Sequence, residues 1–183
     1  MNMLPNEAIS FIEEIEPLVK DTNNEVIICV PFTDFFYANN MAQGTNIQVG
    51  VQNMHYEDKG AYTGEISAPM LKSVNCKYVI IGHSERRHNN LENNHIINNK
   101  IRNALSSKII PILCVGENKE EKATDQTFEV IKKELLEAIK DVNINKLVVA
   151  YEPVWSIGTG NVPSIEDINK VVKKYIERKR NIL

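Results

Sequence analysis

Two side chains in this sequence, Glu152 and His83, are of the types that catalyse proton transfer. Glu152 follows an apolar run and is flanked by Tyr151 and Pro153, which predicts a partly desolvated carboxylate that acts as a base near neutral pH. A lone histidine like His83 more often only caps a strand, but here the polar residues 84–87 follow at once, where a helix should begin. Because a helix N-terminus lowers the pKa of a nearby histidine, we expect a neutral imidazole that donates a hydrogen bond. This pair could move a proton between carbons next to a carbonyl.

A Gly-Thr-Gly triplet at residues 158–160 follows Glu152 closely. Successive backbone N–H groups in such a flexible stretch can close over an anion, and a phosphate is one candidate. One such triplet is a weak signal, and its position shortly after the candidate base strengthens it.

Five apolar runs rich in valine and isoleucine must position these groups. They are nearly continuous, which is typical of parallel strands buried on both faces; they span 25–32, 46–54, 77–84, 109–117 and 146–154. Helical periodicity fills the intervals at 7–20, 96–105 and 128–139, and a further helix begins with a capping-box-like sequence at Ser164. No linker interrupts this order, so the sequence predicts one α/β domain over residues 1–183.

Polar residues gather where four of these runs end. They are Gln52 and Asn53, His83 and Ser84, Gly116 and Glu117, and Glu152. The carboxyl ends of parallel strands are where α/β proteins bind ligands. Of these residues, Glu117 is expected to lie in a solvated loop, because Asn118, Lys119 and Glu120 follow it.

Composition excludes several classes of protein. The 183 residues carry 21 basic and 24 acidic side chains, a balance that gives no reason to expect nucleic acid or an anionic membrane as partner. The three cysteines are far apart and lack the spacing of a zinc site or a disulfide framework. No apolar run has the ~20 residues of a membrane helix, and the N-terminus has no signal-peptide pattern. We therefore expect a cytoplasmic protein without a metal.

Four stretches carry a resemblance to a known family. "YVIIGHSERR", "AYEPVWSIGTG", "QNMHYEDKGAYTGEIS" and "PILCVGE" resemble triosephosphate isomerase, in that family's order and over nearly the whole chain. The resemblance implies an eight-stranded βα (TIM) barrel and interconversion of dihydroxyacetone phosphate and D-glyceraldehyde 3-phosphate in glycolysis and gluconeogenesis through an enediol(ate), with no cofactor.

The resemblance also implies roles for individual residues. Glu152 resembles the base that shuttles the proton, and His83 the neutral group that polarises the carbonyl. Gly158 resembles the residue that donates its N–H to the substrate phosphate, and Ser84 and Glu85 take supporting positions. The lid loop of the family corresponds to Pro153, Val154, Trp155, Ser156, Ile157, Thr159 and Gly160, together with Gly158.

A long loop at 52–67 resembles the family's dimer loop. The resemblance implies a homodimer in the complete protein, with Thr63 at the loop tip and Glu65 pairing with Arg86 across the interface. A loop of this length without secondary structure is uncommon unless it has a function.

The sequence departs from the family pattern at both ends. The family's first strand ends in Asn-x-Lys-Met-Asn, whereas this chain begins Met1-Asn2-Met3, and it stops at Leu183 after the sixth helix. We therefore expect an incomplete barrel of five parallel strands, equivalent to strands 2–6, with little activity by itself. The alternatives are an incomplete gene product of the isomerase and a non-catalytic fragment or association module of the same fold. A freestanding doubly wound phosphate-binding domain is disfavoured, because the segment 31–34 lacks a glycine-rich turn.

Overall fold

The computed structural model describes residues 2–176, so Met1 and Leu183, the two chain ends named above, lie outside it. Its sheet has five strands in the order β1-β2-β3-β4-β5. They are β1 (Val26–Val30), β2 (Ile47–Val51), β3 (Tyr78–Ile81), β4 (Ile110–Val115) and β5 (Val148–Tyr151). Each lies inside one of the five predicted runs, and the pairs β1–β2, β2–β3 and β4–β5 are parallel. The predicted fold class is confirmed.

The described chain forms two compact units. The first comprises the residues up to Ile80 together with Asn103–Pro111, and the second comprises Ile81–Arg102 together with the residues from Ile112 onward. The prediction of a single domain over 1–183 stays a prediction, and each unit is described by itself below.

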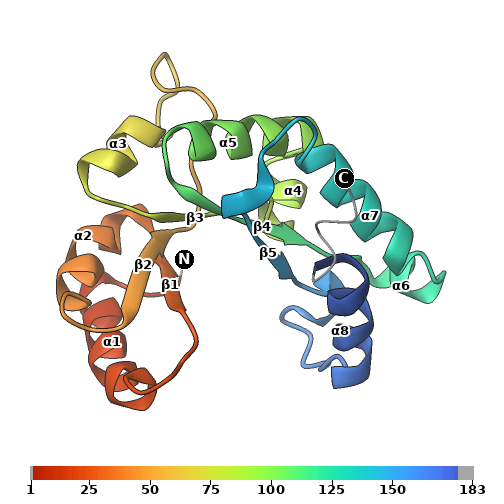
Figure 1. The fold of residues 1–183 in the computed structure, drawn as a ribbon, viewed down its shortest axis with the longest axis horizontal. Helices are drawn as coiled ribbons and strands as arrows, with labels where there is room; N and C mark the ends of the chain where they lie inside the picture. The colour runs from red at the N-terminus through yellow and green to blue at the C-terminus, as the bar shows by residue number, and fades with distance from the viewer. Residues whose placement is uncertain (1, 177–183) are drawn as a thin grey trace. The chain divides into compact units, whose positions relative to one another are not determined.

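The first unit packs helices against the amino-terminal strands. Its helices are α1 (Pro5–Val19), α2 (Phe32–Met41) and α3 (Ala68–Ser73), and Figure 1 shows α1 and α2 on one side of β1 and β2. The Glu7 carboxylate accepts the Leu4 N–H at 2.7 Å, which satisfies a free amide at the start of α1. Ala8 and Ile12, one helical turn apart, are buried and form the apolar stripe that the periodicity predicts.

The second unit contains the remaining elements. These are α4 (Ser84–Asn89), the start of α5 (Asn94–Ser106), α6 (Lys119–Ala123), α7 (Thr127–Ala138), η1 (Ile144–Lys146), η2 (Val154–Ser156), α8 (Ile165–Val171) and the π-helix η3 (Val172–Ile176). The Ser164 hydroxyl accepts the Asp167 N–H at 3.1 Å, so the predicted helix start is confirmed. Ile131, Leu135 and Ala138 form the buried stripe of α7.

The strands are shorter than the apolar runs, and the difference matters at β3. The predicted strand 77–84 ends at Ile81 because Gly82 turns the chain with a φ of +76°, a conformation that favours glycine. His83 then becomes the N-cap of α4. The histidine therefore lies at the junction of a strand and a helix.

Among the described residues, no helix combines the length and apolar character needed to cross a membrane. Cys29 and Cys76 are free thiols; Cys76 and Cys114 are buried and Cys29 is half-buried. Burial raises the pKa of Cys29 to about 12 and that of Cys76 to about 11, so neither is a reactive thiolate near neutral pH.

Candidate active site

The second unit brings His83 and Glu152 into direct contact. His83 follows β3 and Glu152 follows β5, and their Nε2 and Oε2 atoms are 3.0 Å apart. The other carboxylate oxygen, Oε1, accepts the backbone N–H of Ser84 at 2.8 Å. Both oxygens of Glu152 are thus held at the start of α4, and the two residues that the sequence singled out lie side by side.

The hydrogen bonds of His83 define which ring nitrogen carries a proton. Its Nδ1 lone pair accepts the Glu85 N–H at 3.2 Å, so Nδ1 carries no proton in this arrangement. In the neutral ring the proton therefore lies on Nε2, facing Glu152. A carbonyl oxygen placed at that position would receive the same hydrogen bond.

The pKa of His83 departs from the sequence-based expectation. The hydrogen bond to Glu152 raises it above the usual histidine value, partial burial opposes this, and the charges of Glu152 and Glu85 raise it further. The expected lowering by the helix N-terminus is therefore wrong for this arrangement. The reason is that a carboxylate in contact outweighs a partial helix charge.

The backbone of Glu152 lies directly on β4. Its N–H donates to the Val115 carbonyl at 2.9 Å, and the Val154 N–H donates to the Glu117 carbonyl at 3.0 Å. Between these two bonds, a Cβ added to Gly116 would lie 1.9 Å from the Glu152 carbonyl oxygen. Only glycine allows this approach, so the position of the candidate base depends on the end of β4.

The expectation that Glu117 is solvated is wrong. Its side chain is completely buried and accepts hydrogen bonds from the Tyr151 hydroxyl at 3.1 Å and the Trp155 indole N–H at 2.8 Å. The exposed helix α6 begins two residues later, and that helix accounts for the polar residues after Glu117. Burial and the charge of Glu117 raise the pKa of Tyr151, which keeps this hydroxyl a hydrogen-bond donor.

The predicted lid segment 153–160 is hydrogen-bonded within itself. Its first part forms η2, where the Ser156 N–H and hydroxyl both donate to the Pro153 carbonyl, at 2.9 and 2.8 Å. The Thr159 hydroxyl lies within 3.2 Å of the Trp155 and Ser156 carbonyls. Gly158 and Gly160, with φ values of +69° and +77°, are exposed. The indole of Trp155 therefore anchors the start of a segment whose glycine end faces solvent.

Arg87 and Glu134 also lie beside the site, but the sequence did not predict them as part of it. The Arg87 side chain lies 3.4 Å from the Glu134 carboxylate, which in turn accepts the Gly116 N–H at 3.0 Å. The signal for Glu134 was available, because this charged residue neighbours the buried stripe of α7. A carboxylate in that position needs a partner.

Arg86 and Glu85 have other contacts. Arg86 Nε lies 2.6 Å from Glu92 Oε1, and Lys100 Nζ lies 2.7 Å from the same oxygen. The Glu85 side chain is exposed, and its backbone N–H donates a hydrogen bond to His83 Nδ1. The expected pairing of Arg86 with Glu65 of a second chain stays a prediction.

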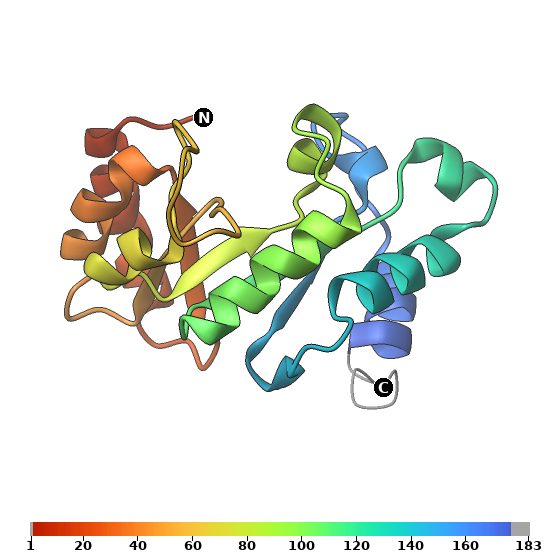
Figure 2. The same ribbon diagram turned by 90° about the horizontal axis from the view of Figure 1, so that it is seen from above.

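In the first unit, the predicted dimer loop 52–67 has no helix or strand, and Figure 2 shows the excursion between β2 and α3. The His55 ring stacks on Tyr56 and lies against Tyr62, with centroid distances of 4.3 and 4.2 Å. The His55 N–H donates to the Ile66 carbonyl at 2.8 Å and closes the base. Thr63 is exposed near the loop tip, and the loop is ordered by its own side chains.

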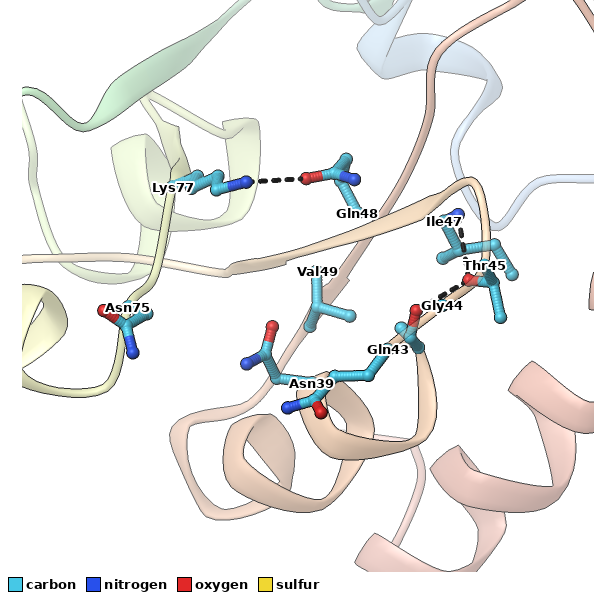
Figure 3. Close-up of a pocket in the computed structure, with 10 residues that line it drawn as sticks. Asn39, Gln43, Gly44, Thr45, Ile47, Gln48, Val49, Asn75 and Lys77 are labelled. Atoms are coloured by element: carbon cyan, nitrogen blue, oxygen red, sulfur yellow. Dashed lines mark hydrogen bonds between the residues drawn. The ribbon is translucent and has the colours of Figure 1, made fainter.

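The first unit also contains a polar cavity of about 200 Å³ between α2, β2 and the segment that precedes β3. Figure 3 shows Lys77 and Gln48 joined at its rim, and none of the predicted site residues lines it. Within residues 2–176, no cluster of three or more His, Cys, Asp or Glu side chains could hold a metal ion.

Comparison with known proteins gives a consistent result. The sequence model of triosephosphate isomerase matches residues 1–181. Triosephosphate isomerase of Thermoanaerobacter pseudethanolicus is 47% identical over 176 residues, covering 94% of this chain and 71% of the relative. That of Alkaliphilus oremlandii is 43% identical over 188 residues, covering 100% and 76%. A crystal structure of triosephosphate isomerase from Bartonella henselae superposes with a TM-score of 0.85 at 34% identity, covering 98% of this chain and 71% of that one. The juxtaposed histidine and glutamate thus lie in a chain that belongs to the triosephosphate isomerase family.

Proposed function

We propose that this chain supplies the proton-transfer pair of a triose-phosphate isomerase that interconverts dihydroxyacetone phosphate and D-glyceraldehyde 3-phosphate. The observation that carries the proposal is the 3.0 Å contact between His83 Nε2 and Glu152 Oε2. It holds a carboxylate base and an imidazole N–H at one point, as proton transfer beside a carbonyl requires. The family relationship supports the identity of the substrate.

In the proposed reaction, the Glu152 carboxylate removes a proton from the carbon next to the carbonyl. The electron pair of that C–H bond forms the C=C bond of an enediolate, and the carbonyl oxygen takes the negative charge. His83 Nε2–H donates a hydrogen bond to this oxygen and stabilises the charge. His83 Nε2–H gives its proton to this oxygen and the ring then takes the proton of the neighbouring hydroxyl, so that the negative charge moves to the other oxygen. Glu152 returns its proton to the adjacent carbon as the electron pair of the C=C bond forms the new C–H bond, and the aldose and ketose forms are exchanged without net change in protons.

The charge state of His83 depends on where Glu152 lies. While the two side chains are in contact, Glu152 is the largest cause that raises the His83 pKa. When Glu152 turns to a substrate carbon, that hydrogen bond is lost, and partial burial, which lowers the pKa, outweighs the smaller raising effect of the Glu85 charge. Substrate binding would therefore favour the neutral imidazole that the mechanism needs.

We also propose that residues 153–160 form a lid that closes over the substrate. Trp155 anchors one end through Glu117, and the N–H of Gly158 would bind the substrate phosphate when the lid closes. A closed lid excludes water from the enediolate and suppresses loss of phosphate.

A hybrid protein tests the proposal. Residues 1–183 would be joined to the segments of the Thermoanaerobacter relative that lie outside the matched region, and isomerase activity would be measured in a coupled assay. We expect activity in the hybrid, and a loss of at least ~10²-fold in turnover for Glu152→Gln and for His83→Gln. Glu129→Gln, an exposed change on α7, is the control. Full activity in Glu152→Gln would refute the assignment.

The 183-residue chain alone is proposed to have little activity. These residues contain no Asn-x-Lys-Met-Asn motif, and the lysine of that motif would stabilise the developing negative charge. Loss of one such preorganised group costs roughly 10²–10³ in rate. Turnover of the purified chain within about tenfold of the hybrid would contradict this.

We further propose that the complete protein is a cytoplasmic homodimer formed through the loop 52–67. The free thiols of Cys29 and Cys76 suit a reducing compartment, and the aromatic packing of His55, Tyr56 and Tyr62 gives the loop a defined shape. In the hybrid, deletion of the tip around Thr63 should give a folded monomer with far lower activity. Sedimentation of the intact hybrid as a fully active monomer would exclude the dimer.

A further inference from the structure

A partly buried ion pair next to the candidate catalytic residues has no role in the proposed reaction. The side chains of Arg87 and Glu134 are only 18% and 14% exposed, and their closest charged atoms are 3.4 Å apart. Burial raises the pKa of Glu134, while the charge of Arg87 and the Gly116 N–H lower it. Burying a charged pair costs free energy unless other hydrogen bonds compensate. The other hydrogen bonds of Arg87 and Glu134 therefore show which parts of the structure the pair stabilises.

Arg87 binds the backbone on the His83 side. Its Nε donates to the Gly82 carbonyl at 2.8 Å, directly before His83, and its Nη2 reaches the Cys114 carbonyl of β4 at 3.4 Å. Its Nη1 donates to Asn94 Oδ1 at 2.6 Å. The planar guanidinium therefore joins the end of β3 to the end of β4.

Glu134 binds the backbone on the Glu152 side. Its Oε2 accepts the Gly116 N–H at 3.0 Å, and the Gly116 Cα faces the Glu152 carbonyl so closely that no side chain fits between them. The hydrogen bonds from Glu152 N–H and Val154 N–H lie on either side of this contact. A shift of Gly116 would thus move the backbone of Glu152.

We infer that Glu134, paired with Arg87, is a positioning residue that holds the backbones of His83 and Glu152 at the separation proton transfer needs. Neither side chain need touch the substrate. This inference rests on the proposed function for its catalytic consequence, but its structural part is independent of activity. A displacement of about 1 Å between reacting groups can cost roughly 10²-fold in rate.

The test compares two substitutions of nearly equal volume. Glu134→Gln keeps an oxygen that accepts the Gly116 N–H, whereas Glu134→Met fills the space and removes the acceptor. Glu129→Met on the same helix, at an exposed position, is the control. The 183-residue chain would be labelled with ¹⁵N-histidine and ¹⁵N-tryptophan, and His83→Gln would assign the His83 signal among the four histidines.

Two NMR signals report the site without any assay. In Glu134→Met, we expect the His83 pKa to fall toward the ordinary value of about 6.5, because the contact with Glu152 loosens. The single tryptophan, Trp155, should shift its indole N–H signal, because Glu117 follows Gly116. Glu134→Gln and Glu129→Met should keep both signals near their wild-type positions. A Glu134→Met protein with wild-type signals, or a Glu134→Gln protein that changes as much as Glu134→Met, would overturn the inference.

Kinetics of the hybrid separate this inference from the proposed function. Glu134→Met should lower kcat roughly 10–100-fold with KM nearly unchanged, and Glu134→Gln should restore most of the loss. Altered NMR signals in a hybrid that has no isomerase activity would refute the proposed function and leave the positioning role standing. Unaltered signals in an active hybrid would refute only the positioning role.

Discussion

The indole N–H of Trp155 donates to the buried carboxylate of Glu117 at 2.8 Å. The same carboxylate accepts the hydroxyl of Tyr151, four residues before the tryptophan. One carboxylate just after β4 thus binds both Tyr151 and Trp155, and the candidate base lies between these two anchored aromatic residues in the chain. The segment proposed as the lid therefore begins at a tryptophan that is fixed by a hydrogen bond.

Glu117→Ala should therefore destabilise the protein and release Trp155. Each buried polar group left without a partner costs about 1–3 kcal/mol, so we expect a loss of about 2 kcal/mol or more from the free energy of unfolding. Urea titration followed by circular dichroism measures this, and Trp155 emission should shift to longer wavelength. Glu117→Gln, which keeps an acceptor oxygen, should lose less. Equal stability of Glu117→Ala and wild type would show that the hydrogen bonds from Tyr151 and Trp155 contribute nothing.

The contact between His83 and Glu152 predicts a pH dependence of stability. The folded pKa of His83 is raised, so its stabilising contribution is fully present below the unfolded value of about 6.5 and is lost as pH rises through the folded pKa. The difference in unfolding free energy between wild type and Glu152→Gln should be largest near pH 6 and should shrink toward pH 8.

Urea titrations at several pH values measure this difference. His95→Gln, a change at an exposed histidine on α5, serves as the control and should follow the wild-type profile. A difference that grows with pH would mean that Glu152 does not raise the pKa of His83.

Gly116→Ala should displace the backbone of Glu152. The added Cβ would lie 1.9 Å from a carbonyl oxygen, and backbone cannot move away as a flexible side chain would. We expect a loss of about 3 kcal/mol or more and an altered His83 titration. Gly158→Ala is the matched comparison, because a Cβ added there has no atom within 4 Å. Its only expected effect is the backbone strain of a side chain at a φ of +69°, a loss of about 1–2 kcal/mol in the free energy of unfolding. If both changes cost the same, the close approach at Gly116 is unimportant.

Local patterns were sufficient to predict the strands and the candidate pair. Continuous runs of valine and isoleucine located all five strands, and the polar residues after β3 and β5 pointed to His83 and Glu152. The environment of Glu117 was not predictable in this way, because its partners Tyr151 and Trp155 come from β5 and η2, more than 30 residues later in the chain. The sequence indicates that a residue lies at the end of a strand, but it does not indicate which side chains of other elements bury that residue.

The same reason explains the error at His83 and the omission of Glu134. The helix N-terminus beside His83 is a local feature, whereas Glu152, which dominates its pKa, is 69 positions away in the sequence. Glu134 acts through Gly116, 18 residues earlier. Contacts between elements decide these properties, and a single sequence contains no direct record of them.

The last prediction concerns which carboxylate acts as the base. Glu152 and Glu117 both follow strands, but Glu117 has both oxygens bonded to Tyr151 and Trp155 in a closed, buried site. Glu152 is partly accessible, with its side chain 17% exposed, and lies against His83. A base must reach a substrate carbon, so only Glu152 is placed to do so.

Shortening each side chain by one methylene separates the two roles. In the hybrid, Glu152→Asp should lower turnover ~10²-fold with little change in KM, because the carboxylate retreats by about 1 Å. Glu117→Asp should weaken the Trp155 anchor, with a larger effect on stability than on turnover. Steady-state kinetics and urea titration of the two variants, measured side by side, distinguish these outcomes. Near-normal turnover in Glu152→Asp, combined with abolished turnover in Glu117→Asp at unchanged stability, would assign the base to Glu117 instead.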